Sequence, residues 1–313
     1  MALKYIFGPA PSRRLGRSLG LNVVPSKICS LDCLYCEVGK TKAVTTKKAA
    51  YYKASKIVEE FKENFHLFEE ICDVITVTGA GEPTLNSELN DILVGIKSVT
   101  NKPVAILTNT TTINDESVYN TLLKFDIVVP SLDAVDNENF NAIDKPDKKI
   151  DLDGIINSLI KFSHEFTGKI YLEILFCKNI NDSSDHVLKY LDILPKMKLD
   201  KVQIGTIHRP PAYSNIEKVS DEFLLETTKL FLNHNIPAEM TSGFSVVFKE
   251  SKSDNLRDLI PTLLKMRPCT IDDLSGVFGK SRENIQLVIN ELLENNIILK
   301  ENYSNEDYFS LKK

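Results

Sequence analysis

Residues 29–36 read CSLDCLYC and bring together Cys29, Cys33 and Cys36, three of the six cysteines in the chain. Three and then two other residues separate them, and no histidine lies nearby. A structural zinc site would need four ligands, and a disulfide framework is typical of secreted domains. The spacing instead favours an iron–sulfur cluster bound through three of its irons, which leaves the fourth iron open for chemistry.

The composition is that of a globular protein that does not enter a membrane. The 313 residues are 42% hydrophobic and 26% charged, enough for one large domain and a small one. No apolar run approaches the roughly 18 residues of a membrane span, and the first residues lack the apolar core of an export signal. The net charge of −5 argues against non-specific binding to nucleic-acid phosphates. Few, unevenly placed cysteines fit a reducing compartment, so we expect a cytoplasmic protein.

Beyond the cysteines, apolar strands alternate with amphipathic helices. Strands are predicted at 73–78, 103–108, 126–132, 169–177, 201–207 and 237–241, after a first short strand at 21–25. Helices are predicted at 54–68, 87–99, 115–124, 152–166, 184–194 and 221–234. Such alternation is typical of parallel strands joined by helical crossovers. We therefore predict an α/β fold for residues 1–250, a partial or full (β/α) TIM-like barrel of about six units.

Small and polar residues follow the predicted strands. They form the stretches GAGEPT at 79–84, TNTT at 108–111, SLDA at 131–134, CKNIND at 177–182 and TIHR at 206–209. Singly, such stretches are ordinary turns. Reacting groups gather at the carboxyl ends of parallel strands, so their recurrence beside the cysteine loop favours a ligand site.

Three arginines, Arg13, Arg14 and Arg17, lie among small residues shortly before the cysteines. They fit a solvated surface loop. They equally fit a site where a guanidinium binds an anion near the cluster, since arginine matches carboxylate and phosphate forks.

The motif Cys-x3-Cys-x2-Cys, with Tyr35 before its last cysteine, resembles that of the radical S-adenosylmethionine (radical SAM) superfamily. The GAGEP stretch at 79–83 resembles the Gly-Gly-Glu-Pro motif of the same superfamily, with Ala80 as an insertion. A closer likeness is to the wyosine-synthetase-like Fe–S oxidoreductases. It is carried by stretches that include 8–9, 12–16, 78–85, 131–133 and 209–211.

The resemblance implies a role for each matching position. Cys29, Cys33 and Cys36 would each bind one iron of a [4Fe–4S] cluster, and the amino and carboxylate groups of S-adenosylmethionine would chelate the fourth iron. Further residues would bind this cofactor: at its methionine amino group Gly79, Gly81 and Glu82; at its ribose or carboxylate Asn109, Ser131 and Asp133; and near its adenine Tyr35.

The implied reaction begins with one electron, which a flavodoxin- or ferredoxin-type protein would supply. The electron breaks a carbon–sulfur bond of S-adenosylmethionine and yields methionine and a 5′-deoxyadenosyl radical. This radical abstracts hydrogen from an unidentified small molecule, nucleotide or peptide. No cysteine precedes Cys29, so the second cluster of the tRNA-modifying wyosine enzymes is not expected here. We therefore do not expect this chain to share their tRNA substrate.

Cys177 ends the strand predicted at 169–177, on the face that Glu173 shares. If this face lines the mouth of the barrel, the Cys177 thiol is placed to donate hydrogen to a product radical. The alternative is simple packing in the core. His208, Arg209 and Tyr213, which follow the strand at 201–207, are candidates for substrate contact.

Residues 251–313 are predicted to form a small winged-helix-like domain. Helices at 256–266, 271–278 and 281–294 precede a hairpin at 297–311. Residues 255–313 hold eight Lys or Arg against nine Asp or Glu, which favours a protein partner, a peptide substrate or a cover for the barrel over DNA. The alternative to an enzyme is a redox-responsive regulator that binds DNA through the winged helix. The strand-end motifs favour the enzyme, because a sensor needs no Glu82-type contact with a sulfonium ligand.

Overall fold

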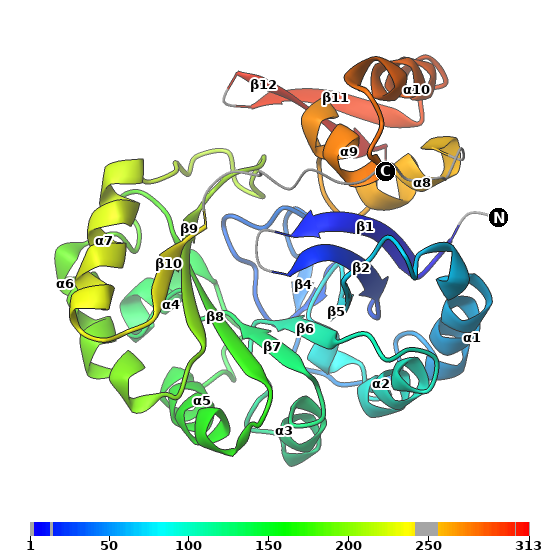
Figure 1. Cartoon of the computed structure of the whole chain (residues 1–313). Helices are drawn as coiled ribbons and strands as arrows, with labels where there is room; N and C mark the ends of the chain where they lie inside the picture. The colour runs from blue at the N-terminus through cyan, green and yellow to red at the C-terminus, as the bar shows by residue number, and fades with distance from the viewer. Residues whose placement is uncertain (1–2, 13–14, 242–255, 304, 313) are drawn as a thin grey trace.

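The computed structural model describes residues 3–12, 15–241, 256–303 and 305–312. Its main body is one eight-stranded sheet in the order β1-β2-β5-β6-β7-β8-β9-β10 (Figure 1). Its strands are β1 (Ile6–Ser12), β2 (Gly16–Asn22), β5 (Val74–Thr78), β6 (Val104–Thr108), β7 (Ile127–Pro130), β8 (Lys169–Phe176), β9 (Lys201–Thr206) and β10 (Ala238–Met240). Neighbouring strands from β2 to β10 are parallel, and β1 is antiparallel to β2. Within the described residues no ladder joins β10 to β1, so the sheet forms a partial barrel.

Helices cover the outer face of this curved sheet (Figure 1). They are α1 (Ala54–Asn64), α2 (Leu89–Lys97), α3 (Glu116–Leu122), α4 (Asn137–Ile143), α5 (Leu152–Glu165), α6 (Ser184–Lys189) and α7 (Asp221–Asn233). Ile57 and Phe61 of α1, one turn apart, are 0% exposed and join the main apolar core, where each stabilises the fold by roughly 1.5–3 kcal/mol. Side-chain caps such as Asp115 and Ser220 begin α3 and α7. None of the described helices is both long and apolar enough to cross a bilayer.

The predicted strands from residue 73 onward and the six predicted helices are confirmed, with shifted ends. The first strand is wrong in extent, because β2 begins at Gly16 rather than Leu21. Strand β1 was not predicted, since Gly8, Pro9 and Pro11 disfavour a strand. Its position at the edge of the sheet tolerates proline.

The C-terminal elements form a second apolar cluster beside the β1–β2 hairpin (Figure 1). They are α8 (Leu256–Leu264), α9 (Ile271–Phe278), α10 (Arg282–Glu294), β11 (Ile298–Tyr303) and β12 (Glu306–Leu311). Strand β1 contributes Ala10 to this cluster, so the C-terminal unit packs directly on the edge of the barrel. The predicted boundary at residue 250 lies outside the described residues, as do Arg13 and Arg14.

Candidate active site

The cysteine loop, residues 29–36, is held on both sides by backbone hydrogen bonds. On one side β3 (Ile28–Cys29) pairs with β4 (Ala43–Val44). On the other side, the N–H groups of Asp32 and Leu34 donate to the carbonyl oxygens of Asp144 (3.0 Å) and Ile143 (2.9 Å) at the end of α4. The three cysteines of the loop are half-buried free thiols, so the two flanking segments present them together.

The chemistry of this loop fits a [4Fe–4S] cluster. Burial raises the pKa of Cys29 to about 12 and the pKa of Cys33 well above its ordinary value, so both stay protonated until a metal displaces the proton. Two donors reach the sulfurs, since Lys27 Nζ lies 3.6 Å from Cys36 Sγ and Asn109 Nδ2 lies 3.6 Å from Cys29 Sγ. In the described part of the chain, no three Cys, His, Asp or Glu side chains converge as ligands of a single ion. A cluster offers each thiolate its own iron, so it does not need such convergence.

Glu82 connects the ends of β5 and β6. Its side chain is 2% exposed, and its Oε1 accepts hydrogen bonds from the Thr84 hydroxyl (2.6 Å), the Thr84 N–H (3.1 Å) and the Thr108 hydroxyl (2.7 Å). Its Oε2 accepts from the Asn109 N–H (2.8 Å). Burial raises the pKa of Glu82, and these hydrogen bonds act against that rise. The carboxylate is therefore a buried, fixed group beside the cysteine loop.

The GAGEP turn packs directly on the backbone that leads into the cysteine loop. The Glu82 N–H donates to the Ile28 carbonyl (2.8 Å), and a Cβ at Gly81 would lie only 1.9 Å from that oxygen. Only glycine fits at position 81. The inserted Ala80 receives its own contacts, because its N–H donates to Asn22 Oδ1 (3.2 Å) and its carbonyl accepts from the Lys27 N–H (2.6 Å).

Asp133, after β7, joins the cysteine loop to β8. Its Oδ2 accepts a hydrogen bond from the Tyr35 hydroxyl, and its Oδ1 accepts from the Leu175 N–H (2.7 Å). Burial, together with Asp133, raises the pKa of Tyr35 well above its ordinary value, so the phenol is neutral. The Asn181 side chain donates to the carbonyl of Asp133 and to that of Leu175, both at 2.8 Å.

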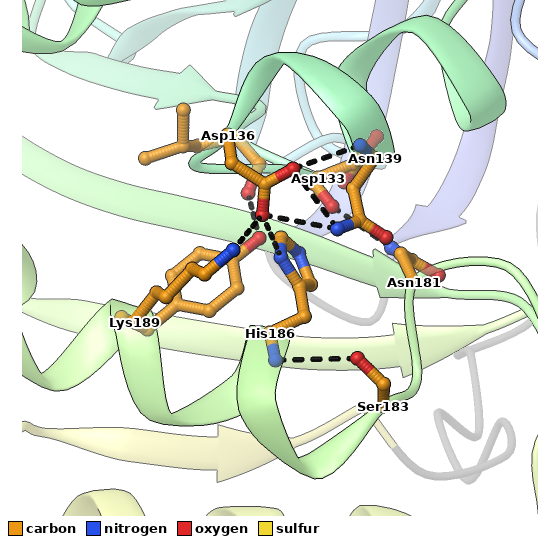
Figure 2. Close-up of polar contacts among 9 residues, drawn as sticks. Asp133, Asp136, Asn139, Asn181, Ser183, His186 and Lys189 are labelled. Atoms are coloured by element: carbon orange, nitrogen blue, oxygen red, sulfur yellow. Dashed lines mark hydrogen bonds and ion pairs between the residues drawn. The ribbon is translucent and has the colours of Figure 1, made fainter.

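Behind Asp133 lies a polar network that the sequence did not predict (Figure 2). Asp136 caps α4 by accepting from the Asn139 N–H (2.9 Å), and it also contacts His186 Nδ1 (2.9 Å) and Lys189 Nζ (2.9 Å). His186 is 1% exposed, and burial lowers its pKa despite the contact with Asp136. The neutral imidazole therefore donates from Nδ1 and ties α6 to the loop that carries Asp133.

Several of the predicted site residues surround one cavity of about 240 Å³ inside the partial barrel. Its wall includes Tyr35, Cys36, Ser131 and Asp133, together with Glu173 and Leu175 of β8 and residues 205–209 at the end of β9 and just beyond it. Gly79 lines a neighbouring cavity of about 230 Å³. Gly81, Glu82 and Asn109 connect to the cysteine loop through the hydrogen bonds above. The structure thus brings the strand ends and the cysteine loop together.

Arg209 joins three parts of the chain. It is 4% exposed, and its guanidinium contacts Glu37 beside the cysteine loop (3.1 Å), Asp273 of α9 (3.6 Å) and the carbonyl of Pro268 (3.0 Å). The Tyr308 hydroxyl of β12 donates to the adjacent His208 carbonyl (2.8 Å). Arg209 lines the 240 Å³ cavity, so a contact with a substrate stays a prediction, and its ion pairs tie the C-terminal unit to the cysteine loop.

Two other candidates lie away from the cavity wall. The Cys177 side chain is 0% exposed and absent from the described lining of the cavity, a placement that favours the packing role. Tyr213 contacts the cysteine loop, because its hydroxyl donates to Asp32 Oδ2 (2.6 Å) and its N–H to the Leu34 carbonyl (3.1 Å).

Comparison with known proteins identifies the family. The model of the radical SAM superfamily matches residues 23–191. A protein of Brachyspira hyodysenteriae named GTPase Obg is 34% identical over 95% of this chain, which spans only 44% of that protein's length. A UPF0026 protein of Methanocaldococcus jannaschii is 29% identical over 97% of this chain and 94% of its own length.

Solved structures show the same fold. SuiB from Streptococcus suis, bound to S-adenosylmethionine, superposes with a TM-score of 0.53 at 17% identity, over 72% of this chain and 51% of that one. TYW1 with a lysine–pyruvate adduct superposes with a TM-score of 0.52 at 15% identity, over 71% of this chain and 76% of that one. The resemblance in residues 29–36 and 79–83 is confirmed at the level of the superfamily. Because the family model spans more than half of the chain, the chain belongs to the radical SAM superfamily, whose enzymes use a [4Fe–4S] cluster and S-adenosylmethionine.

Proposed function

We propose that this enzyme cleaves S-adenosylmethionine reductively, with Cys29, Cys33 and Cys36 each binding one iron of the cluster. The main support is that the cysteine loop and the ends of β7, β8 and β9 share one cavity. When bound, the reduced cluster and S-adenosylmethionine supply a 5′-deoxyadenosyl radical that abstracts hydrogen from a substrate C–H bond. Three cysteine ligands would leave one iron of the cluster without a protein ligand, available to the amino and carboxylate groups of S-adenosylmethionine.

Glu82 is proposed to receive the methionine amino group together with the backbone of Gly79 and Gly81. The Glu82 Oε1 already accepts three hydrogen bonds, but Oε2 accepts only the one from the Asn109 N–H. A carboxylate oxygen has room for a further donor, so Oε2 is the acceptor for an ammonium group. The buried threonine donors fix its position in advance.

The remaining cofactor contacts are proposed for the ends of β6 and β7. Asn109, Ser131 and Asp133 would accept or donate hydrogen bonds at the ribose or carboxylate, and Tyr35 would lie beside the adenine. The hydrogen bond from the Tyr35 hydroxyl to Asp133 holds its ring in the cavity wall, where it excludes water.

We further propose that the chain divides into a barrel domain, residues 1–250, and a winged-helix-like domain, residues 251–313. A cavity of about 800 Å³ lies between the two, lined by residues 37–39, 264–268 and 310–312 among others. It supports a role for the C-terminal unit in covering the barrel or in binding a peptide or protein substrate. The DNA-binding alternative gains no support, because Arg282 and Glu291 of α10 form ion pairs with Asp272 and Arg257.

The proposal is tested by anaerobic reconstitution of the cluster, followed by dithionite and S-adenosylmethionine. We expect the wild type to form 5′-deoxyadenosine and Cys33→Ala to lose both the cluster colour and the product. Cys72→Ala is the matched control, since Cys72 is a 0% exposed core residue outside the loop. A wild type that forms no 5′-deoxyadenosine while a known radical SAM enzyme does would contradict the proposal.

A further inference from the structure

Lysines gather around the cysteine loop, although the chain as a whole is acidic. Residues 38–53 contain five lysines and no Asp or Glu, against a net charge of −5 for the chain. Two of the five are neutralised, since Lys48 pairs with Asp115 (2.8 Å) and Lys53 with Glu88 (2.9 Å). The others remain available at the surface.

This lysine segment is bonded to the cysteine loop itself. In the β3–β4 pair, Ile28 faces Ala43 and Cys29 faces Val44, and the Thr45 N–H donates to the Cys29 carbonyl (2.8 Å). Lys42, next to this pair in sequence, is exposed, as is Lys40. The charges therefore lie within a few residues of the cluster ligands.

A second lysine segment flanks the loop from its other side. Residues 144–149 are bonded to it through the Asp144 carbonyl and through the Asp147 N–H, which donates to the Ser30 carbonyl (3.0 Å). The two segments meet at Tyr213, whose ring centre lies 4.2 Å from Lys40 Nζ and 3.9 Å from Lys145 Nζ. We name Lys40, Lys42, Lys145, Lys148 and Lys149 the lysine collar.

The lysine collar carries five positive charges, and the carboxylates nearest to it are bonded to groups other than its ammonium groups. Among the described residues, no carboxylate forms an ion pair with any of its five members. Asp32 instead accepts from Tyr213 and from the Thr41 N–H, and Asp147 accepts from the Lys149 N–H (3.0 Å). Bringing Lys40 and Lys145 to one ring costs repulsion that an acidic partner would relieve.

We propose that the lysine collar is the docking surface for an acidic protein that donates one electron, such as a reduced flavodoxin. The inference rests on the proposed function, in which each turnover begins with an electron from outside. The donor is oxidised by one electron and the cluster is reduced by one, and no atom is transferred. None of the collar lysines lines the cavities described above, so the donor would reach the cysteine loop without entering any of them. Complementary charge mainly speeds such encounters, whose interfaces are small.

The first test follows reduction of the reconstituted cluster by reduced flavodoxin, using its visible absorbance in stopped flow. The collar variant Lys40→Glu/Lys145→Glu, and independently Lys148→Glu/Lys149→Glu, should lower the second-order rate constant at least tenfold at low salt. The difference should vanish near 1 M salt, where the screening length falls to about 3 Å. The control is Lys196→Glu/Lys198→Glu, two exposed lysines before β9 at the opposite end of the strands, which should leave the rate unchanged. Dithionite should reduce every variant to the same extent.

The second test needs no cluster. Carbodiimide cross-linking of the cluster-free chain to flavodoxin, read by mass spectrometry, should place the links on the collar lysines and not on Lys196 or Lys198. Equal rates in the collar and control variants, or links spread evenly over the surface, would overturn the docking proposal. Loss of binding to an RNA oligonucleotide in the collar variants, with flavodoxin reduction unchanged, would likewise overturn it and assign the collar to nucleic acid. Failure of dithionite to reduce the wild-type cluster would instead contradict the proposed function.

Discussion

Replacing Glu82 by glutamine tests the buried hydrogen bonds that fix the GAGEP turn. The carboxylate accepts from two backbone N–H groups, one on each oxygen: that of Thr84 on Oε1 and that of Asn109 on Oε2. An amide has only one acceptor oxygen, so in either orientation its –NH₂ group faces one of these backbone N–H groups. Both groups are donors, and neither can accept from the other. One buried donor is left without an acceptor.

The cost of an unsatisfied buried donor is about 1–3 kcal/mol. We therefore expect Glu82→Gln to lower the free energy of unfolding of the cluster-free chain by about 2 kcal/mol. The chain has no tryptophan, so urea unfolding is followed by far-UV circular dichroism. The control is Glu165→Gln, because the Glu165 side chain is 46% exposed and its loss of charge should change stability by less than about 0.5 kcal/mol.

Binding of S-adenosylmethionine to the reconstituted protein separates stability from function. Glu82→Gln should keep the cluster colour and weaken binding, because the acceptor proposed for the amino group is lost. If the free energy of unfolding of Glu82→Gln lies within about 0.5 kcal/mol of the wild-type value, the structural reasoning is refuted. Unchanged affinity would refute the proposed contact with the amino group.

Three further predictions follow from the same contacts. Gly81→Ala should prevent correct folding of the cysteine loop, because its Cβ would lie 1.9 Å from the Ile28 carbonyl oxygen, and far lower iron content after reconstitution measures this. Arg209→Met should lower the free energy of unfolding by about 3 kcal/mol, mainly because it leaves the buried Asp273 carboxylate without its cation, while the half-exposed Glu37 adds little; an unchanged urea midpoint would count against the ion pairs. Burial lowers the pKa of His186 below its ordinary 6.5. As the pH falls below 6.5, His186 therefore takes up a proton in the unfolded chain before it does so in the folded chain. The free energy of unfolding of the wild type should therefore fall as the pH is lowered from neutral to below 6.5. The fall should be smaller for His186→Asn, and urea titrations at neutral and at acidic pH measure the difference.

The strands and the cysteine loop were open to prediction because their signals are local. Apolar runs such as 103–108 and 201–207 fit buried parallel strands, and CSLDCLYC identifies its own chemistry. Strand β1 was not predicted, because glycine and proline are uncommon in strands and are tolerated here only at the edge of the sheet. Helix α4 was not predicted, because it is short and polar. Its N-cap, Asp136, also binds His186 and Lys189, and these contacts exist only in the folded chain.

Long-range partners lay beyond local patterns. The sequence raised the prospect that Arg209 contacts a substrate, but Glu37 and Asp273 are 172 and 64 positions away and meet it only in the fold. The same holds for the lysine collar, whose two segments are about a hundred residues apart in sequence. Gly81 could be predicted only in part. The motif identified it as a site residue, but only the fold shows why glycine is required there, since a Cβ would collide with the Ile28 carbonyl.

The most direct test of the central claim is electron–nuclear double resonance on the reduced cluster with S-adenosylmethionine labelled with nitrogen-15 at its amino group. If Cys29, Cys33 and Cys36 leave one iron open, the amino nitrogen binds that iron, and the spectrum shows a nitrogen-15 coupling that unlabelled cofactor lacks. A reduced cluster whose spectrum does not change when the labelled cofactor is added would mean that no iron is open, and the account would be wrong.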